Sequence, residues 1–346
     1  MIEVVVANEY DLRDNVERFR AGRYARHLLF GVQRLQPPGF RARLVGESLP
    51  GVLNRRPIRF LVTNVRAAWA GQRADVVYST FTYGAVLAGL VRTVTRRPRR
   101  VVTVLHGLPR LLARHPRLFR LLYGGHDALA FLSPTDLDAV RAHLPARQQA
   151  TWVPWGPSQA WAEAVGARSG AASGGAPFAL AVGRSKRDWD TLRRAHEHGG
   201  FPLVVVAGAD CPLQDGPRLA VHKPAAGQRE ALPLADLTAL YREASVVVLP
   251  LVEDTSLNGL TALGEALASR STVVMTRTPA MRGVAAQHGQ WVVLVPPQDP
   301  AALAGAVARA LAAGPPDAEL ALPTAERFEA VVLGLIRGPE DGPRTP

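Results

Sequence analysis

Short apolar runs alternate with amphipathic stretches along this chain, and the alternation predicts repeated strand–helix units. In the first half we expect strands at 3–7, 42–45, 75–79, 100–105, 128–132 and 151–154. Apolar residues at helical spacing between these runs predict helices at 24–35, 83–94 and 135–144, the last opened by a capping box from Ser133 to Asp136. Strands that alternate with helices form parallel, doubly wound sheets, so the predicted fold class is α/β.

The same alternation restarts after a stretch of small residues at 167–177. The second half predicts strands at 178–182, 203–207, 219–221, 245–251, 272–276 and 291–295 and helices at 189–195, 233–244, 259–269, 280–287, 300–313 and 324–336. We therefore expect two Rossmann-like domains joined by a short hinge. The expected boundaries are a first domain at 1–156, a linker at 157–177, a second domain at 178–316, a helix within 317–338 that packs back toward the first domain, and a disordered tail at 339–346.

The segment from Ser245 to Val274 holds the most informative pattern, because a buried strand is followed by a polar loop, one helix and a second strand. A helix N-terminus after the carboxyl end of a parallel strand is a good phosphate site. Glu265, two turns into that helix, can then reach a ribose hydroxyl. The alternative is an amphipathic helix with a solvated glutamate, and the segment alone leaves both open.

Basic residues are concentrated in the first half of the chain. The 346 residues carry a net charge of +12, and all but two of the 41 basic residues are arginine. Residues 1–155 contain 24 basic and 10 acidic residues, whereas 156–346 contain 17 and 19. The first half therefore suggests an anionic partner, which can be a membrane surface, a phosphorylated acceptor or nucleic acid.

Several function classes lack support in the sequence. The single cysteine, Cys211, excludes an intrachain disulfide and a multi-cysteine metal site. The HExxH, GxSxG, Walker A, CxxC and GxGxxG patterns are absent. No apolar run approaches the ~20 residues that span a bilayer, and the N-terminus lacks a signal-peptide pattern, so we expect a cytoplasmic protein.

Three segments of the second half resemble the donor-binding domain of a GT-B glycosyltransferase, most closely glycosyltransferase family 4. They are FALAVGRSKRDWD at 178–190, the strand at 241–250, and NGLTALGEALASRSTVVMTRTPAMR at 258–282. Segments 75–107 and 128–156 fit the family more loosely. The resemblance implies two Rossmann-like domains facing a cleft. It also implies metal-independent, retaining transfer of a sugar from a UDP- or GDP-linked donor to a hydroxyl acceptor.

The resemblance also assigns residues. Fixed cations or N–H groups must stabilise the departing diphosphate, and Arg184 and Arg187 match the basic positions that do so in the family. Glu265 matches the glutamate that holds the donor ribose, and His106 matches a histidine that faces the donor sugar across the cleft. The main-chain amides of Leu257, Asn258, Gly259 and Leu260 would meet the distal phosphate and the sugar. Gly22 is a candidate remnant of a glycine-rich substrate loop.

One position departs from the family pattern. Family members carry a second glutamate eight positions before the ribose glutamate, where this chain has Leu257. Asp254 is the candidate catalytic substitute and Glu253 is its neighbour, although both acids can instead cap the helix. The departure leaves the anomeric outcome open. It also raises the alternative of a sugar-nucleotide-binding protein without transferase activity.

Leu108–Tyr123, LPRLLARHPRLFRLLY, interleaves leucine and phenylalanine with arginine. We expect one or two short helices broken near Pro116, whose basic and apolar character suits an anionic membrane. Leucines at helical spacing are equally typical of a core. Nucleic-acid binding is a weaker alternative, because the positive charge lacks interleaved aromatic residues and a known reader motif.

Overall fold

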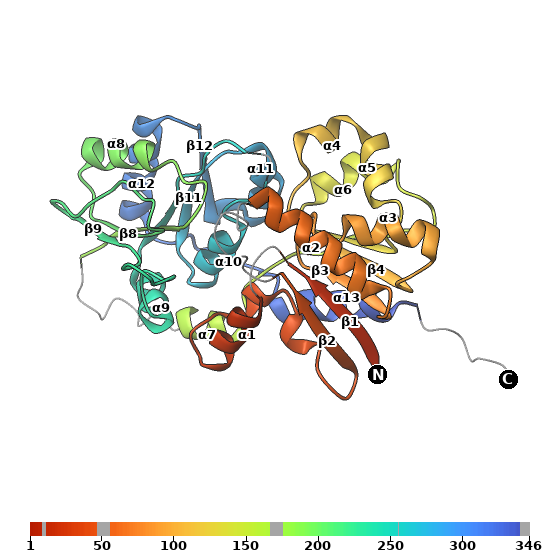
Figure 1. The fold of residues 1–346 in the computed structure, drawn as a ribbon. Coiled ribbons are helices and arrows are strands. Elements are labelled where there is room, and N and C mark those ends of the chain that lie inside the picture. Colours follow the sequence, from red (N-terminus) through yellow and green to blue (C-terminus); the bar gives the residue numbers. More distant parts are fainter. Residues whose placement is uncertain (9–11, 47–55, 167–175, 255, 340–346) are drawn as a thin grey trace. The chain divides into compact units, whose positions relative to one another are not determined.

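The computed structural model describes residues 1–8, 12–46, 56–166, 176–254 and 256–339. The chain forms two compact units (Figure 1). The first unit consists of Met1–Pro154 and Ala325–Pro346, and the second consists of Trp155–Thr324. Within the described ranges, no helix combines the length and the apolar character needed to cross a membrane.

The first unit contains a six-stranded parallel sheet in the order β2-β1-β3-β4-β5-β6. Its strands are β1 (Ile2–Ala7), β2 (Phe40–Val45), β3 (Val76–Ser79), β4 (Arg100–Leu105), β5 (Ala128–Phe131) and β6 (Gln149–Trp152). Its helices are α1 (Leu12–Arg20), α2 (Arg56–Gly71), α3 (Val86–Thr95), α4 (Arg110–Arg114), α5 (Pro116–Tyr123), α6 (Pro134–Arg141) and α13 (Ala325–Arg337). The predicted strands and the break at Pro116 are confirmed.

One helix prediction for the first unit fails, and two helices were not predicted. The predicted helix at 24–35 is wrong, and helices α1 and α2 were not expected. That segment forms two 3-10 turns, η1 (Arg26–Leu29) and η2 (Val32–Arg34), because Phe30 and Gly31 between them are both left-handed, with φ of 50° and 83°. Gly22 was expected at a helix start. It instead follows the end of α1 with φ of 69°, a conformation that favours glycine.

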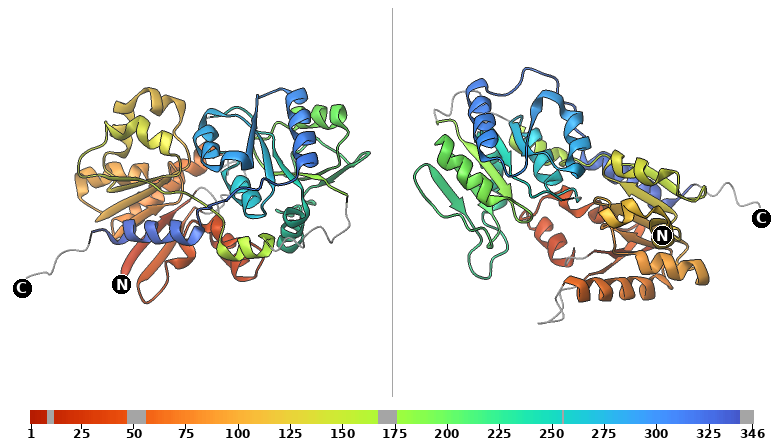
Figure 2. Two further views of the ribbon diagram at one scale, coloured as in Figure 1. Left: turned by 180° about the vertical axis from the view of Figure 1, so that it is seen from behind. Right: turned by 90° about the horizontal axis from the view of Figure 1, so that it is seen from above.

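Helix α13 packs on the first unit through a buried carboxylate. Glu329 receives two hydrogen bonds from the Arg26 guanidinium, at 3.1 and 2.5 Å, and one from the Gln33 amide. At the other end of α13, the Arg100 Nε–H donates to the Leu335 carbonyl at 2.6 Å. Figure 2 shows the helix, in dark blue, next to the strands of this unit. Paired, hydrogen-bonded charges of this kind can be buried without a large penalty, so α13 holds the segment from Arg26 to Gln33 in place.

The second unit contains another six-stranded parallel sheet, in the order β12-β11-β10-β7-β8-β9. Its strands are β7 (Ala179–Gly183), β8 (Leu203–Ala207), β9 (Leu219–His222), β10 (Val246–Leu249), β11 (Thr272–Thr276) and β12 (Val292–Val295). Its helices are α7 (Gln159–Gly166), α8 (Trp189–Gly199), α9 (Leu234–Glu243), α10 (Leu260–Ala268), α11 (Pro279–Ala285) and α12 (Pro300–Ala313), with the 3-10 segment η4 (Ala286–Trp291). The predicted elements are confirmed here within a few residues.

The linker expected at 157–177 is only partly a linker. Residues 159–166 form α7, whose Trp161 and Val165 are buried and which packs against α9 and α10 in the second unit. Burial of two apolar side chains on one helical face explains why this stretch is ordered. Residues 167–175 of the expected linker, and 340–346 of the expected tail, lie outside the described residues.

The strand order of the second unit determines where a ligand can bind. Strand β7 lies between β8 and β10, so the chain first builds the sheet outward from β7 in one direction and then in the other. The strand order therefore reverses between β7 and β10. Open α/β sheets bind ligands at such a switch point.

Candidate functional site

The loops that follow β7 and β10 are joined by main-chain hydrogen bonds. The Asp188 N–H donates to the Pro250 carbonyl at 2.8 Å, and the Val252 N–H donates to the Lys186 carbonyl at 3.1 Å. These bonds fix residues 186–188 beside 250–252. The basic loop predicted from 178–190 and the polar loop before α10 therefore form one platform at the switch point of the second sheet.

Arg187 lies at the centre of this platform. Its guanidinium folds back over the end of β7, where Nε donates to the Val182 carbonyl at 3.1 Å and Nη1 donates to the Ser185 carbonyl at 2.9 Å. A Cβ atom at Gly183 would lie 2.2–2.4 Å from this guanidinium, so only glycine leaves room for it. A guanidinium has five N–H groups, and this anchoring therefore leaves donors for a ligand.

Burial is the largest influence on the pKa of Arg187, which it lowers to about 10, and the Tyr241 and Glu265 charges oppose this effect. The side chain therefore stays protonated at neutral pH. A positive charge shielded from solvent interacts more strongly with an anion than an exposed one does. This electrostatic setting suits a phosphate group.

Glu265 is buried on α10, with only 7% of its surface exposed. The alternative of a solvated glutamate on an amphipathic helix is thus wrong, because both faces of α10 are covered. The Tyr241 hydroxyl, from the end of α9, donates to Glu265 Oε2 at 2.9 Å. Burial and the neighbouring carboxylate raise the pKa of Tyr241 well above its ordinary value, so the phenol remains a hydrogen-bond donor.

The polar loop before α10 is organised around Asp254. Its Oδ2 accepts hydrogen bonds from the Ser256 hydroxyl at 2.9 Å and the Asn258 amide at 3.2 Å, and lies 4.0 Å from Lys186 Nζ. The N-cap of α10 is Gly259, which has φ of 93° and no side-chain capping bond. The alternative in which Glu253 and Asp254 cap this helix is therefore wrong at the N-cap position.

Leu257 faces the interior and is only 7% exposed. The position where the family pattern has a glutamate therefore carries a buried apolar side chain. Leu260, at the start of α10, is also buried, which leaves main-chain N–H groups as the polar feature of this turn. The predicted amide contacts from residues 257–260 remain a prediction.

Arg184, the second diphosphate candidate, takes a different direction from Arg187. Its side chain is exposed and forms an ion pair of 3.5 Å with Glu230, and Nη1 lies 3.4 Å from the Arg229 carbonyl. The structure therefore brings Arg187, Tyr241 and Glu265 into one electrostatic cluster and places the Arg184 side chain against another loop.

His106 directly follows strand β4 of the first unit and is held as a neutral imidazole. Its Nε2–H donates to the Thr80 carbonyl at 2.8 Å, and because a carbonyl only accepts, Nδ1 is the acceptor nitrogen of the ring. Burial lowers the pKa of His106 to about 4. A partly exposed, neutral imidazole can accept a hydrogen bond from a sugar hydroxyl.

Aromatic rings and a hydrogen-bonded turn position His106. The Phe30 ring contacts the imidazole edge-on at a centroid distance of 4.7 Å, and Phe81 lies at 6.1 Å. Thr80 in turn receives a hydrogen bond on Oγ1 from the Asn8 amide at 2.6 Å. Polar residues after β1, β3 and β4 thus meet at one edge of the first sheet.

Sequence reasoning missed three residues that complete these surroundings: Phe30, Thr80 and Tyr241. Thr80 and Asn8 are each the first residue after a predicted strand, a position that could have marked them. Tyr241 is 24 residues from its partner Glu265, and Phe30 contacts His106 only through tertiary folding. Neither contact has a local signal.

Metal binding was not expected from the resemblance. Across the described parts of the chain, no three histidine, cysteine, aspartate or glutamate side chains gather into a group that could bind a metal ion. The cation near the second unit's carboxylate is Arg187.

Two doubly wound parallel-sheet domains, each with helices around a six-stranded sheet, match the GT-B fold of glycosyltransferases. Residues 187–313 match the family model described as "Glycosyl transferases group 1". This match begins at Arg187 and includes Glu265. It confirms the predicted enzyme class, a glycosyltransferase. No curated protein matches the chain in sequence.

Solved structures confirm the fold. An α,α-trehalose-phosphate synthase (UDP-forming) from Burkholderia vietnamiensis matches with a TM-score of 0.63 at 18% identity, over 97% of this chain and 95% of that one. A sucrose-phosphate synthase from Thermosynechococcus elongatus matches at 0.58 and 18%, over 96% and 94%. The Anabaena protein HepE, solved with UDP and glucose, matches at 0.55 and 12%, over 97% of both chains.

Proposed function

We propose that this chain is a metal-independent, retaining glycosyltransferase of family 4 that moves a sugar from a nucleoside-diphosphate donor to a hydroxyl acceptor. The observation that carries the proposal is the buried Glu265 carboxylate, bonded by Tyr241 and close enough to Arg187 to influence its pKa. This cluster lies at the switch point of the second sheet, where α/β domains bind nucleotides.

Each member of the cluster has a distinct role in the proposal. Arg187 faces the diphosphate, while Glu265 accepts the ribose hydroxyls and is kept in position by Tyr241. A UDP-linked donor is preferred over a GDP-linked one, because the similar structures include a UDP-forming synthase and a protein solved with UDP. The N-terminal amides of α10 add a partial positive charge near the distal phosphate.

The reaction breaks the bond between the anomeric carbon and a diphosphate oxygen and forms a bond from that carbon to the acceptor oxygen. The electron pair of the broken bond leaves with the nucleoside diphosphate. Arg187 stabilises the negative charge that develops there, as a fixed cation does best when it needs no reorganisation. No metal ion is needed for this role, so activity is expected to survive chelation by EDTA.

His106 and Asp254 act on the sugar in this proposal. The neutral His106 accepts a hydroxyl of the donor sugar at Nδ1 and orients it. Asp254 substitutes for the acid that Leu257 replaces, and its bonds to Ser256 and Asn258 hold the carboxylate in one orientation. The acceptor is a hydroxyl compound held mainly by the first unit.

Isothermal titration calorimetry with UDP, GDP and inorganic diphosphate tests the donor site directly. We expect UDP to bind, and Arg187→Gln to weaken UDP at least tenfold through the lost diphosphate contact. Arg194→Gln, an exposed arginine of α8, is the matched control and should change nothing. Absence of binding to every nucleoside diphosphate would refute the proposal, and equal binding by the Arg187 variant would refute the diphosphate assignment. The anomeric outcome is read by NMR of the product.

Leu257 favours a second candidate, a protein that binds sugar nucleotides without transferring the sugar. A buried leucine where the family pattern has an acid removes a group that positions the donor sugar. Mass spectrometry of nucleotide-sugars retained by the purified protein identifies the donor. Incubation of that donor with hydroxyl acceptors then separates the two candidates, because only the enzyme releases free nucleoside diphosphate.

The proposal places the enzyme in the cytoplasm, with peripheral contact to an anionic membrane through the first unit. The basic charge of this unit supports that contact.

A further inference from the structure

The net positive charge of the chain originates in one stretch of the first unit. Residues 56–123 contain thirteen arginines and a single acidic residue, Asp75, which together equal the +12 of the whole chain. This stretch forms helices α2, α3, α4 and α5. Helix α2 packs beside α3, and α3 beside α5, as Figures 1 and 2 show.

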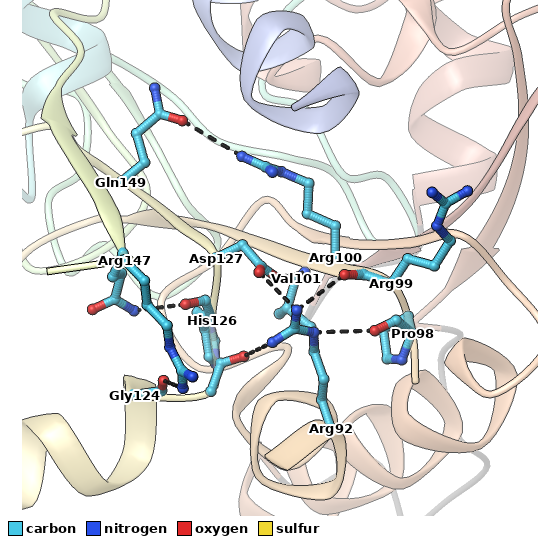
Figure 3. A network of polar contacts seen from close by, with 12 residues as sticks. Arg92, Pro98, Arg99, Arg100, Val101, Gly124, His126, Asp127, Arg147 and Gln149 are labelled. Carbon is cyan, nitrogen blue, oxygen red and sulfur yellow. Dashed lines mark hydrogen bonds and ion pairs between the residues drawn. The ribbon is translucent and has the colours of Figure 1, made fainter. Parts of the chain in front are cut away.

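Not all of these arginines serve a surface. Arg92 bonds inside the unit to the carbonyls of Pro98, Arg99 and Gly125 and to Asp127 Oδ1 at 2.7 Å, as Figure 3 shows for most of these contacts. Arg100 bonds to Leu335. The arginines with exposed side chains are Arg66, Arg73, Arg96, Arg97, Arg99, Arg114, Arg117 and Arg120. The outer surface of this helical layer therefore remains strongly basic.

Helix α2 carries large apolar side chains on its outer side. Leu61, Val65 and Trp69 recur every four residues on one stripe and are 63%, 49% and 73% exposed. Its buried positions include Thr63, Asn64, Ala67, Ala68 and Ala70. Phe60 is partly buried against Phe81 and Tyr83, so Leu61, Val65 and Trp69 are the large apolar residues of α2 that face outward.

A cavity of about 290 Å³ adjoins this stripe. Val65 and Trp69 form its apolar wall, and Arg13 of α1, Arg43 of β2 and Arg66 of α2 contribute three positive charges. Among the described residues that line the cavity, none is acidic. The pocket therefore suits an anionic head group whose apolar part extends along Val65 and Trp69.

We propose that this α2 face, defined by Leu61, Val65 and Trp69 with Arg13, Arg43 and Arg66, binds an anionic lipid bilayer. Tryptophan and leucine insert into the interface between head groups and acyl chains, while arginines on the same surface attract anionic lipids. The α2 face supplies both kinds of group on one rigid helix.

Charge and side-chain type distinguish this occupant from two others. Nucleic acid would use the arginines and could stack a base on Trp69, but it gains little from exposed Leu61 and Val65, which neither stack on bases nor bond to phosphates. A second copy of the chain would bring two strongly positive surfaces together. A bilayer that contains anionic lipid complements both the charge and the apolar stripe.

The Leu108–Tyr123 stretch contributes less than its sequence suggested. Phe119 and Tyr123 are fully buried in the core of the first unit, and Leu112 is also buried. Leu111 on α4 and Leu121 on α5 remain exposed among Arg114, Arg117 and Arg120. These residues extend the basic layer, whereas the apolar stripe and the cavity belong to α2.

Co-sedimentation of the full chain with vesicles tests the proposal. We expect binding to vesicles with 30% phosphatidylglycerol in phosphatidylcholine at 50 mM salt, and none to pure phosphatidylcholine. A Leu61→Ser, Val65→Ser, Trp69→Ser variant keeps every charge and should bind at least tenfold more weakly. The Arg13→Gln, Arg43→Gln, Arg66→Gln variant should lose roughly 100-fold, given the contribution of each arginine near an anionic surface.

Matched controls keep the test specific. Arg194→Gln, Arg218→Gln, Arg309→Gln removes the same charge from exposed sites of the second unit, and Trp152→Ser removes another partly exposed tryptophan. Both should bind vesicles like the parent. The proposal is wrong if the serine variant binds vesicles as well as the parent does, or if the second-unit arginine control loses as much binding as the Arg13, Arg43, Arg66 variant. It is also wrong if the parent does not bind the anionic vesicles.

Two further measurements separate other sources of the same signal. Tryptophan fluorescence should be quenched by brominated lipid in the parent and not in Trp69→Phe, because Trp69 is the most exposed of the six tryptophans. Inorganic phosphate at millimolar concentration should not displace the protein from the vesicles. If DNA displaces the parent and the serine variant from the vesicles equally well, the protein binds polyanions in general and the proposal is wrong. The inference rests on the membrane contact of the proposed function, and because these readouts need no sugar donor, its failure can be distinguished from a failure of the proposed transferase activity.

Discussion

The two units place different chemistry at the same kind of position, the carboxyl edge of a parallel sheet. In the second unit this edge carries a buried carboxylate, a phenol and a guanidinium, from Glu265, Tyr241 and Arg187. In the first unit it carries His106, a neutral imidazole held by a carbonyl and surrounded by aromatic rings. The cluster at one edge is charged, and the imidazole at the other edge, called the neutral edge below, is uncharged.

Under the proposed function, this difference in chemistry assigns different roles to the two units. A diphosphate and a ribose need a cation and an acceptor, and both are present in the second unit. A sugar ring carries no charge, and the first unit offers an uncharged acceptor beside aromatic surfaces. Variants of the second unit should therefore change donor affinity, while variants of the first unit should change turnover.

Glu265→Gln should produce the largest effect. The amide keeps the size of the side chain but removes the charge near Arg187 and one acceptor for the ribose. Truncating one member of a buried charged pair costs about 2–5 kcal/mol, so the Kd for UDP should rise roughly 100-fold. Isothermal titration calorimetry measures this value.

Glu243→Gln is the control for this change, because it alters an exposed glutamate at the end of α9, two residues from Tyr241. Its Kd should equal that of the parent. A Glu265 variant with unchanged affinity would remove Glu265 from the donor site and leave the charged edge without an anchor.

Gly183→Ala tests whether the position of Arg187 matters as much as its charge. The new Cβ would lie 2.2–2.4 Å from the guanidinium, so the arginine must move off the end of β7 while all charges remain. We expect roughly 30-fold weaker UDP binding by calorimetry. Gly216→Ala, at a glycine with open space around it, should bind normally, and a Gly183 variant that also binds normally would contradict the anchoring role.

The second unit was predictable because the hydrophobic positions in its sequence are the positions that the structure buries. Continuous apolar runs such as 272–276 became fully buried strands, and the helix predicted at 300–313 is α12 with the same bounds. The switch-point position of Arg187 and Glu265 follows from the order of these elements. The link through Tyr241 does not, because it depends on how α9 and α10 pack.

The first unit was less predictable because, in parts of it, the large hydrophobic positions in the sequence are not the positions that the structure buries. Helix α2 buries alanines and exposes Leu61, Val65 and Trp69, so the apolar positions did not indicate the helix. At 24–35 the helical spacing was present, yet left-handed Phe30 and Gly31 break the helix. Tertiary contacts to α13 supply the stabilisation that local propensity does not.

Glu329→Gln tests whether α13 contributes to the neutral edge. Glu329 holds Arg26 and Gln33 on either side of Phe30, and Phe30 contacts His106. Weakening these bonds should let the Phe30 segment shift, and kcat should fall about tenfold while the Kd for UDP stays constant. Glu326→Gln changes a more exposed partner of Arg26, 3.4 Å away, and should change kcat little. A variant in which kcat stays constant despite a lower Tm would show that Glu329 is structural alone.

The smallest expected effect distinguishes a neutral His106 from a titrating one. Burial lowers its pKa to about 4, so the imidazole keeps its acceptor nitrogen from pH 8 down to pH 5. The pH dependence of kcat should therefore have the same shape for the parent and for His106→Gln over this range, although the absolute kcat differs. A break near pH 6.5 in the parent alone would show that His106 acts as a general acid or base.

Two titrations accompany this comparison and have opposite signs. The unfolded chain protonates His106 near pH 6.5 and the folded protein near pH 4, so the free energy of unfolding should fall as pH falls through this window, and His106→Gln should reduce that fall. Burial raises the pKa of Asp136, whose carboxylate accepts from the Leu108 N–H at 3.1 Å, to about 6. Its contribution to stability is therefore lost as pH rises from about 4 through 6.

Urea denaturation of His106→Gln and Asp136→Asn across pH 4–8 separates the stability contributions of the two residues. A break in the kcat profile near pH 6 that persists in His106→Gln and disappears in Asp136→Asn would be caused by the Asp136 carboxylate.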